Sequence, residues 1–307
     1  MNDIILKTNK LTKIYGKQTV NQDISLTIKK GEIYGLVGQN GAGKTTLIRM
    51  ITGLIYESNG SIELFGKSSP NELDKARTMI GSLIEMPAFY GDMTANENLE
   101  VSRLVRNIAG EKCIDEVLEL VGLENVGKKK VKNFSLGMKQ RLGIANALLG
   151  NPRLLILDEP INGLDPMGIV EIRELLKKVN REKDVTILIS SHILSELSEI
   201  ATCYGFIDKG QLIQEISSKD LEEKCKQYIE IKVDDTSRTT TILEQEFKDI
   251  SYEVLPGNII KIFNNLDRVG YINTIVASNG VIVEKIVLNT DNLEGYFMNM
   301  IGGTQNA

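Results

Sequence analysis

Residues 38–45 read GQNGAGKT, a glycine-rich loop between the apolar stretch IYGLV and the stretch TTLIRMITGLI (Thr45–Ile55). The loop matches the pattern G-x-x-x-x-G-K-[ST], which is informative when a strand precedes it and a helix follows it. Both conditions hold here, because IYGLV has the composition of a strand and apolar residues recur at helical spacing after Thr45. The stretch therefore predicts a phosphate-binding loop of the P-loop type in an α/β fold.

Each residue type in this loop has a physical reason to bind a nucleoside triphosphate. Glycines let backbone N–H groups approach phosphates without a Cβ clash, and the N-terminus of the following helix adds its dipole. The Lys44 ammonium reaches the β- and γ-phosphates, and the Thr45 hydroxyl is suited to Mg²⁺. We expect ATP to be bound by Gly38, Gln39, Asn40, Gly41, Ala42, Gly43, Lys44, Thr45 and Thr46.

A second motif, LLILDEP, begins at Leu154 and places Asp158 and Glu159 at the end of a continuous apolar run. Such a run is typical of a buried parallel strand, and open α/β sheets bind ligands at the carboxyl ends of their strands. Two adjacent carboxylates at that edge invite separate roles. We expect Asp158 to belong to the Mg²⁺ site and Glu159 to polarise the attacking water as the general base.

Strand and helix patterns alternate through most of the chain and predict an α/β domain over residues 1–217. A capping box, TANE, opens a helix at Thr94, and we place a helical subdomain at about residues 86–150. The charged segment SSKDLEEKCK predicts a linker at residues 218–226. Short strands and helical segments beyond it predict a small α+β domain over residues 227–307.

Several predicted helices have boundaries that the structure tests. The patterns indicate helices after Lys139 as far as Leu149, over Pro166–Arg181, near Thr241–Phe247 and near Asp267–Ala277. The closing segment LEGYFMNMIGG, residues 293–303, is compatible with an amphipathic terminal helix.

Composition excludes several classes of protein. The chain carries 36 basic and 41 acidic residues, a net charge of −5, which gives no electrostatic footprint for a nucleic-acid partner. Its three cysteines are widely spaced, so neither a disulfide framework nor a zinc site is expected. No apolar window approaches the roughly 18 to 20 residues that a membrane-spanning helix needs. If the protein serves a membrane, we expect it to do so as a peripheral subunit.

The segment FSLGMKQR (Phe134–Arg141) resembles the signature segment of the ABC ATPase family, and the resemblance extends from Met1 to about Ser217. It implies an ABC-type fold with a mixed sheet and a helical subdomain. Ser135 and Gly137 match the phosphate-contacting positions of the family, whereas Leu136 and Met138 depart from its usual Gly and Gln. In this family the signature serves the ATP of a partner subunit, so the resemblance implies a head-to-tail dimer, expected here to be a homodimer.

Three more residues are similar to functional positions of the family. Asp165, in the segment NGLD, resembles a residue of the loop that links the two ATP sites. His192 follows the strand pattern VTILIS and resembles the histidine that contacts the γ-phosphate. Tyr15, in LTKIYG, resembles the aromatic residue that stacks on adenine.

Glu85, at the end of IGSLIE, stands where most of the family has glutamine. A carboxylate at this position adds negative charge near Mg²⁺ and the attacking water, so we assign Glu85 to both the metal site and the catalytic set. Glutamate here is similar to the bacitracin-exporter and lantibiotic-immunity branch of bacterial ABC ATPases. The closing segment, residues 293–303, also resembles the tail of that broader exporter group.

The resemblance implies an ATP-hydrolysing subunit that powers export through a separate integral membrane permease, from the cytoplasmic face of the cell membrane. A peptide antibiotic is the preferred cargo, and another small drug, an ion or a polysaccharide is the alternative. A soluble ABC ATPase without a permease is disfavoured. Ribosomal members of that class usually carry two nucleotide domains, and DNA-repair members insert a long coiled coil, neither of which this sequence contains.

Overall fold

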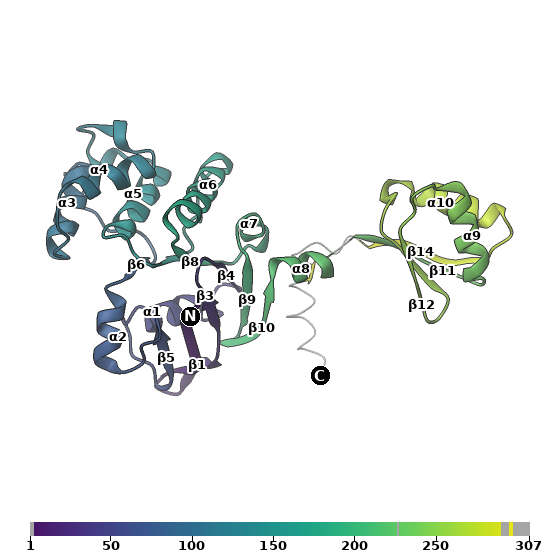
Figure 1. The fold of residues 1–307 in the computed structure, drawn as a ribbon, viewed down its shortest axis with the longest axis horizontal. Coiled ribbons are helices and arrows are strands. Elements are labelled where there is room, and N and C mark those ends of the chain that lie inside the picture. Colours follow the sequence, from purple (N-terminus) through teal and green to yellow (C-terminus); the bar gives the residue numbers. More distant parts are fainter. Residues whose placement is uncertain (1–2, 226, 290–294, 297–307) are drawn as a thin grey trace. The chain divides into compact units, whose positions relative to one another are not determined.

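The computed structural model describes residues 3–225, 227–289, 295 and 296 (Figure 1). The chain divides into two compact units, residues 1–218 and 219–307. The first unit contains the P-loop and the LLILDEP segment, and each unit has a hydrophobic core.

The central sheet of the first unit has the strand order β10-β9-β4-β8-β7-β6. Its strands are parallel from β9 to β6, and β10 is antiparallel to β9. The strands β4, β7 and β8 are buried along their whole length, which explains why their sequences are apolar runs without alternation. Their bounds are β4 Ile33–Val37, β6 Ile80–Leu83, β7 Leu154–Asp158, β8 Thr186–Ser191, β9 Cys203–Asp208 and β10 Gln211–Ser217.

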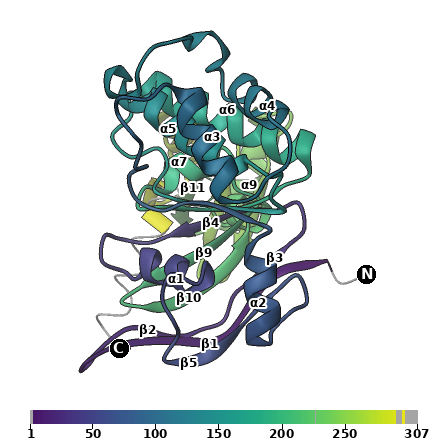
Figure 2. The ribbon, with the colours of Figure 1, turned by 90° about the vertical axis from the view of Figure 1, so that its left-hand side faces the viewer.

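An antiparallel sheet of β1 (Ile4–Tyr15), β2 (Gln18–Ile24), β3 (Thr27–Lys29) and β5 (Asn59–Leu64) lies on the other side of α1 (Lys44–Ile51). Figure 2 shows α1 between this sheet and the central sheet. The core joins all three layers, because buried residues of β1, α1 and β7 belong to one cluster. Both faces of α1 are therefore fixed by packing, and the loop that precedes it is held in place.

The remaining helices of this unit lie outside these three layers (Figure 1). The helical subdomain contains α3, α4 and α5, with the short 3₁₀ turns η1 and η2, and the predicted capping box at Thr94 and Glu97 is present. The bounds are α2 Pro70–Arg77, α3 Ala95–Val105, α4 Lys112–Leu120, η1 Glu124–Val126, η2 Val131–Asn133, α5 Leu136–Leu148, α6 Pro166–Lys183 and α7 Leu194–Ser198.

Two helix starts differ from the sequence prediction for the same reason. The helix predicted after Lys139 begins at Leu136, because the Ser135 hydroxyl accepts a hydrogen bond from Met138 N–H and caps α5. The helix predicted near Thr241–Phe247 is α9, Thr236–Glu246, and the Asp235 side chain caps it. Both helices were predicted to begin too late, because the predictions rested on the spacing of apolar residues and overlooked the capping residue.

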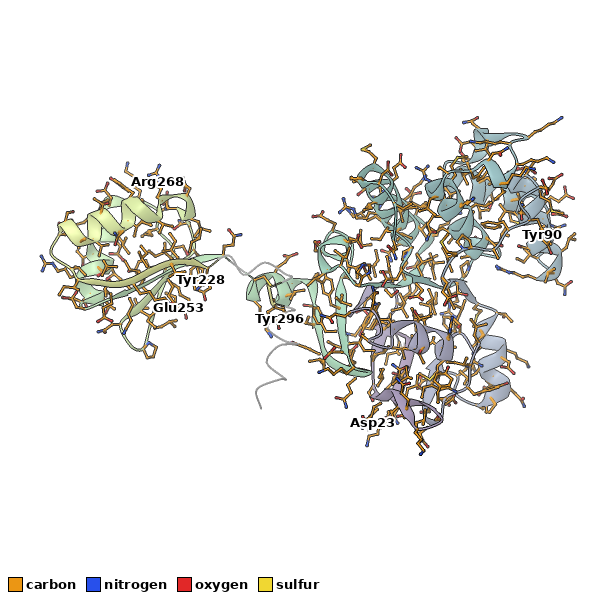
Figure 3. The ribbon with its side chains drawn as sticks, turned by 180° about the vertical axis from the view of Figure 1, so that it is seen from behind. Asp23, Tyr90, Tyr228, Glu253, Arg268 and Tyr296 are labelled. Atoms are coloured by element: carbon orange, nitrogen blue, oxygen red, sulfur yellow. The ribbon has the colours of Figure 1, made fainter. Side chains whose placement is uncertain are left out.

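The second unit is a small α+β module of βαββαβ order that contains strands β11 to β14. Its sheet is antiparallel with the order β12-β13-β11-β14. Arg268 lies on the helical side, and Tyr228 and Glu253 lie on the strand side (Figure 3). The bounds are α8 Ser218–Lys224, β11 Tyr228–Val233, α9 Thr236–Glu246, β12 Tyr252–Leu255, β13 Ile259–Ile262, η3 Leu266–Arg268, α10 Val269–Ser278 and β14 Val283–Asn289.

The terminal helix predicted at residues 293–303 lies outside the described residues except for Gly295 and Tyr296. The core of the module is formed by alternate residues of β11 and β13 with apolar residues of α9 and α10. This alternation is the pattern expected of a sheet that has one face against helices and the other face exposed.

Ile231 is a test of this core, since it is fully buried at the centre of β11. The change Ile231→Ala should cost about 2–5 kcal/mol of the stability of the second unit, because it removes buried methyl groups and leaves a cavity. Hydrogen–deuterium exchange of the amides of β11, β13 and β14 measures this as faster local opening. Ile282→Ala, at a side chain 65% exposed, is the control and should leave exchange unchanged. Unchanged exchange in Ile231→Ala would contradict the described core.

Candidate ATP site

The P-loop connects β4 to α1, and its glycines are required by close backbone approaches. Gly43, the residue before α1, has φ +102°, and a Cβ there would lie 2.5 Å from Nδ2 of Asn21. A Cβ on Gly38 would lie 2.4 Å from the carbonyl oxygen of Ile207. Side chains are therefore excluded at both ends of the loop, and the backbone itself lines the site. Of the other predicted residues, Gln39 and Asn40 are exposed and Thr46 is half-buried.

Lys44 is the buried cation of the site, with a side chain 6% exposed. Its ammonium donates hydrogen bonds to the carbonyl oxygens of Gly38 at 2.6 Å and Gln39 at 3.3 Å. It also lies 3.1 Å from Oε1 of Glu159. The P-loop thus wraps around the lysine that the motif requires, and the ammonium lies against the LLILDEP segment.

Asp158 joins three elements through its carboxylate. The Thr45 hydroxyl, in α1, donates to Oδ2 at 2.7 Å, and the Ser190 hydroxyl, near the end of β8, donates to Oδ1 at 2.5 Å. Asp158 is only 2% exposed, so these two bonds offset part of the cost of burying a charge. Two of the three residues predicted to hold Mg²⁺, Thr45 and Asp158, are therefore in direct contact, whereas the third, Glu85, pairs with Arg49.

Glu159 has φ +50°, which is uncommon for a residue other than glycine and turns the chain immediately after β7. Its N–H donates to the Ser190 hydroxyl at 2.9 Å. Its Oε2 lies 2.8 Å from Nδ1 of His192, which follows β8 directly. The structure thus brings Glu159 and His192, both predicted as catalytic, into contact at the carboxyl edge of the sheet, as the parallel order of β7 and β8 requires.

The signature segment and the segment before α6 share a pocket of about 620 Å³. Ser135 caps α5, and Asp165 caps α6 by accepting a hydrogen bond from Gly168 N–H at 3.1 Å. Two helix N-termini therefore open at this pocket, which is an arrangement favourable to an anion. Its lining includes Ser135, Leu136, Gly137, Met138, Gly163, Leu164 and Asp165. The residues predicted to serve a partner's ATP are thus together, and none of the lining residues belongs to the P-loop.

Two further predicted site residues, Glu85 and Tyr15, each contact a neighbouring basic side chain in the structure. Glu85 forms an ion pair with Arg49 of α1, and its side chain is 61% exposed. Tyr15 ends β1 with 47% of its surface exposed, and the Lys13 ammonium lies 4.9 Å from its ring centroid. The exposed ring face is compatible with stacking on a base.

The residues fit ATP and a hard cation. Oε1 of Glu159 is buried without a hydrogen-bond partner, although Lys44 lies within ion-pair distance of it. A buried acceptor of this kind is suited to a water molecule or a phosphate-bound group. Thr45 and Asp158 offer the kind of oxygen ligands that Mg²⁺ prefers, so these two residues would hold it. Within residues 3–225, 227–289, 295 and 296, no cluster of three or more His, Cys, Asp or Glu could hold a metal by itself.

Sequence reasoning missed four residues that support the site. Ser190 contacts both acidic residues, and Asn21, which is fully buried, donates to the carbonyl oxygen of Gly43 at 3.2 Å. Arg49 is the partner of Glu85. Glu196 accepts a hydrogen bond from the Ser191 hydroxyl at 2.9 Å, and burial raises the pKa of its carboxyl. The serines that interrupt the apolar run TILISS are the one signal that the sequence offered.

Comparison with known proteins agrees with this geometry. The ABC transporter family matches residues 21–162. The chain is 46% identical over 299 residues to the bacitracin transport ATP-binding protein BcrA of Bacillus licheniformis, covering 97% of this chain and 98% of that protein. It is 46% identical over 223 residues to the lantibiotic transport ATP-binding protein SrtF of Streptococcus pyogenes, covering 71% and 95%.

A solved structure described as a dimeric ATP-binding cassette in a post-hydrolysis state, bound to ADP and phosphate, matches with a TM-score of 0.63. Its sequence identity is 26%, and the match covers 70% of this chain and 99% of that one. The chain belongs to the ABC transporter ATP-binding family, and it is an ATP-binding and ATP-hydrolysing subunit. The family and the fold class predicted from the sequence are confirmed.

No helix in the described part of the chain is both long and apolar enough to cross a membrane.

Lys44→Ala should reduce ATP turnover by about 10²- to 10³-fold, the usual effect of removing one charged group that faces developing negative charge. The measurement is steady-state release of phosphate at saturating ATP. Lys177→Ala, which removes an exposed lysine paired with Glu174 on α6, is the charge-matched control and should retain full activity. Full activity in Lys44→Ala would refute the assignment of this site.

Proposed function

We propose that this subunit powers the export of a membrane-active peptide antibiotic through a separate permease, and so confers immunity or resistance. The observation that carries the proposal is the extent of the similarity to the bacitracin transport protein, which covers 97% of this chain and therefore includes most of the second unit as well as the cassette. The lantibiotic transport relative supports the same cargo class for the cassette.

The catalytic roles follow from contacts within this chain. Glu159 is suited to accept a proton from the attacking water, since Oε1 has no hydrogen-bond donor while His192 holds Oε2. Lys44 is suited to neutralise phosphate charge, and Thr45 and Asp158 would hold Mg²⁺, which would supply positive charge against the transferred phosphoryl group. Ser190 fixes the backbone of Glu159 and the carboxylate of Asp158 together, so it aligns the base with the metal site.

A second copy of the chain completes each site in this proposal. The pocket that contains Ser135, Gly137 and Asp165 faces the ATP held by the partner, so two copies pair head to tail around two nucleotides. The dimeric solved cassette, with ADP and phosphate bound, supports this arrangement. Binding of ATP closes the two copies, and hydrolysis and release reopen them.

The permease contact belongs to the segment after Glu85. Met86 and Tyr90 expose 69% and 60% of their surfaces, and Tyr90 lies at the outer edge of the first unit (Figure 3). Exposed large apolar side chains near one another are typical of an interaction surface. We therefore place the subunit at the cytoplasmic face of the membrane, with this segment against an integral membrane partner.

Glu159→Gln should retain ATP binding and slow hydrolysis by about 10²- to 10⁴-fold, the usual cost of losing a general base. Because ATP then persists, the variant should accumulate as an ATP-bound dimer, detected by light scattering coupled to gel filtration. Adding Ser135→Arg to the same chain should abolish this dimer while leaving one-copy binding of ATP intact. A Glu159→Gln chain that stays monomeric at saturating ATP and Mg²⁺ would contradict the shared-site proposal.

The cargo is tested in cells that contain the permease and lack this chain. Restoring the wild-type chain should restore resistance to bacitracin or to a lantibiotic, and restoring Glu159→Gln should not. Sensitivity to an antibiotic that is not a peptide provides the control. If restored resistance were confined to non-peptide drugs, the proposal of a peptide cargo would be wrong, while the assignment as an ATPase would remain.

A further inference from the structure

Arg49 is a cation of the ATP site region to which no role is yet assigned. It lies in α1, four residues after Thr45, so the two side chains share one face of the helix one turn apart. The Thr45 hydroxyl contacts Asp158. The backbone of Arg49 therefore lies about one helical turn after Thr45, and its side chain leaves α1 on the same face as the Thr45 hydroxyl.

The partner of Arg49 is brought to the same place by the central sheet. Leu83, at the end of β6, pairs with Leu157 of β7, so Glu85 follows the carboxyl end of β6 and Asp158 forms the carboxyl end of the neighbouring parallel strand β7. Glu85 has φ +61°, in the left-handed region that a glutamate rarely adopts. The guanidinium of Arg49 forms an ion pair with the carboxylate of Glu85 across this edge.

The charge balance of the site makes this pair consequential. The Asp158 carboxylate contacts Thr45 and the Glu159 carboxylate lies 3.1 Å from Lys44, so two carboxylates already lie against the P-loop, and ATP brings several more negative charges. A third carboxylate that was free to approach Thr45 and Asp158 would repel the phosphates. In the structure Glu85 instead forms an ion pair with Arg49, and its side chain is 61% exposed.

We propose that Arg49 is a positioning residue for Glu85: it holds the carboxylate away from the phosphates and compensates its charge. The pair gives this chain a glutamate at the β6 edge without the electrostatic penalty that an unpaired glutamate would impose on ATP. An exposed ion pair contributes little to folding, so its effect belongs to nucleotide binding and not to stability. The inference concerns ATP binding alone and stands independently of the exported cargo.

The test is a double-mutant cycle on the full-length chain with Arg49→Ala, Glu85→Gln and both changes together. Equilibrium affinity for ATP is measured by displacement of a fluorescent ATP analogue, in EDTA and in Mg²⁺, at physiological ionic strength, where isolated exposed charges are largely screened. Steady-state KM and kcat are measured on the same proteins. Thermal unfolding of every variant checks that the fold is retained.

Arg49→Ala should weaken metal-free ATP binding about three- to tenfold, the size expected for one uncompensated charge near the phosphates in a partly solvated site. It should raise KM more than it lowers kcat. In the Glu85→Gln background the same change should have less than about a twofold effect, because the carboxylate that Arg49 restrains is gone. Arg49→Lys should restore most of the affinity, since it retains the positive charge.

Two results would overturn the proposal. One is an equal loss of affinity for Arg49→Ala in the presence and absence of Glu85, which would show that Arg49 acts independently of it. The other is unchanged affinity for Arg49→Ala in both backgrounds. Arg181→Ala, at an exposed arginine beside Glu182 on α6, is the matched control and should leave ATP affinity unchanged. Because these measurements use no permease and no antibiotic, they separate this inference from the export proposal.

Discussion

The buried carboxylate of Asp158 is the interaction on which the rest of the site depends. It accepts one hydrogen bond from a hydroxyl of α1 and one from a hydroxyl of β8. A single side chain therefore connects α1, β7 and β8 at one edge of the sheet. A charge that is 2% exposed is costly without such partners. The same Ser190 hydroxyl accepts a hydrogen bond from Glu159 N–H, so the position of Glu159, the proposed general base, depends on the residue that holds Asp158.

Lys44 closes the same network from the other side. Its ammonium is bound to two P-loop carbonyl oxygens and lies within ion-pair distance of Glu159. Phosphates are stronger partners for this cation than carbonyl groups, because both members of such a pair are charged. On the proposed mechanism, nucleotide binding would redistribute the contacts of Lys44 and so change the surroundings of Glu159 and, through it, of His192. Binding and catalysis are linked through three adjacent side chains.

The sequence predicted the parts of this site that are written in contiguous motifs. The P-loop and the Asp158–Glu159 pair could be found because strand, loop and helix follow one another directly along the chain. Asn21 and Arg49 could not be found, since each acquires its role from a partner that only strand register and helix packing bring near, and for Ser190 the sequence offered only the polar end of an apolar run. The long strand β1 was missed for a related reason: irregularities in its pairing with β2, β3 and β5 interrupt the alternation that marks a strand.

The most direct measurement of the central claim compares ATP affinity with and without Mn²⁺, a spectroscopic substitute for Mg²⁺, in the wild-type chain and in Asp158→Asn. If Asp158 and Thr45 bind the metal ion, Mn²⁺ should increase the ATP affinity of the wild-type chain. The electron paramagnetic resonance signal of Mn²⁺ should then change when ATP is added, because the ion binds together with the nucleotide. In Asp158→Asn, the increase in ATP affinity that Mn²⁺ causes should be at least tenfold smaller than in the wild-type chain. The variant should still bind metal-free ATP. Equal strengthening by Mn²⁺ in the two proteins would contradict the claim that this carboxylate organises the site.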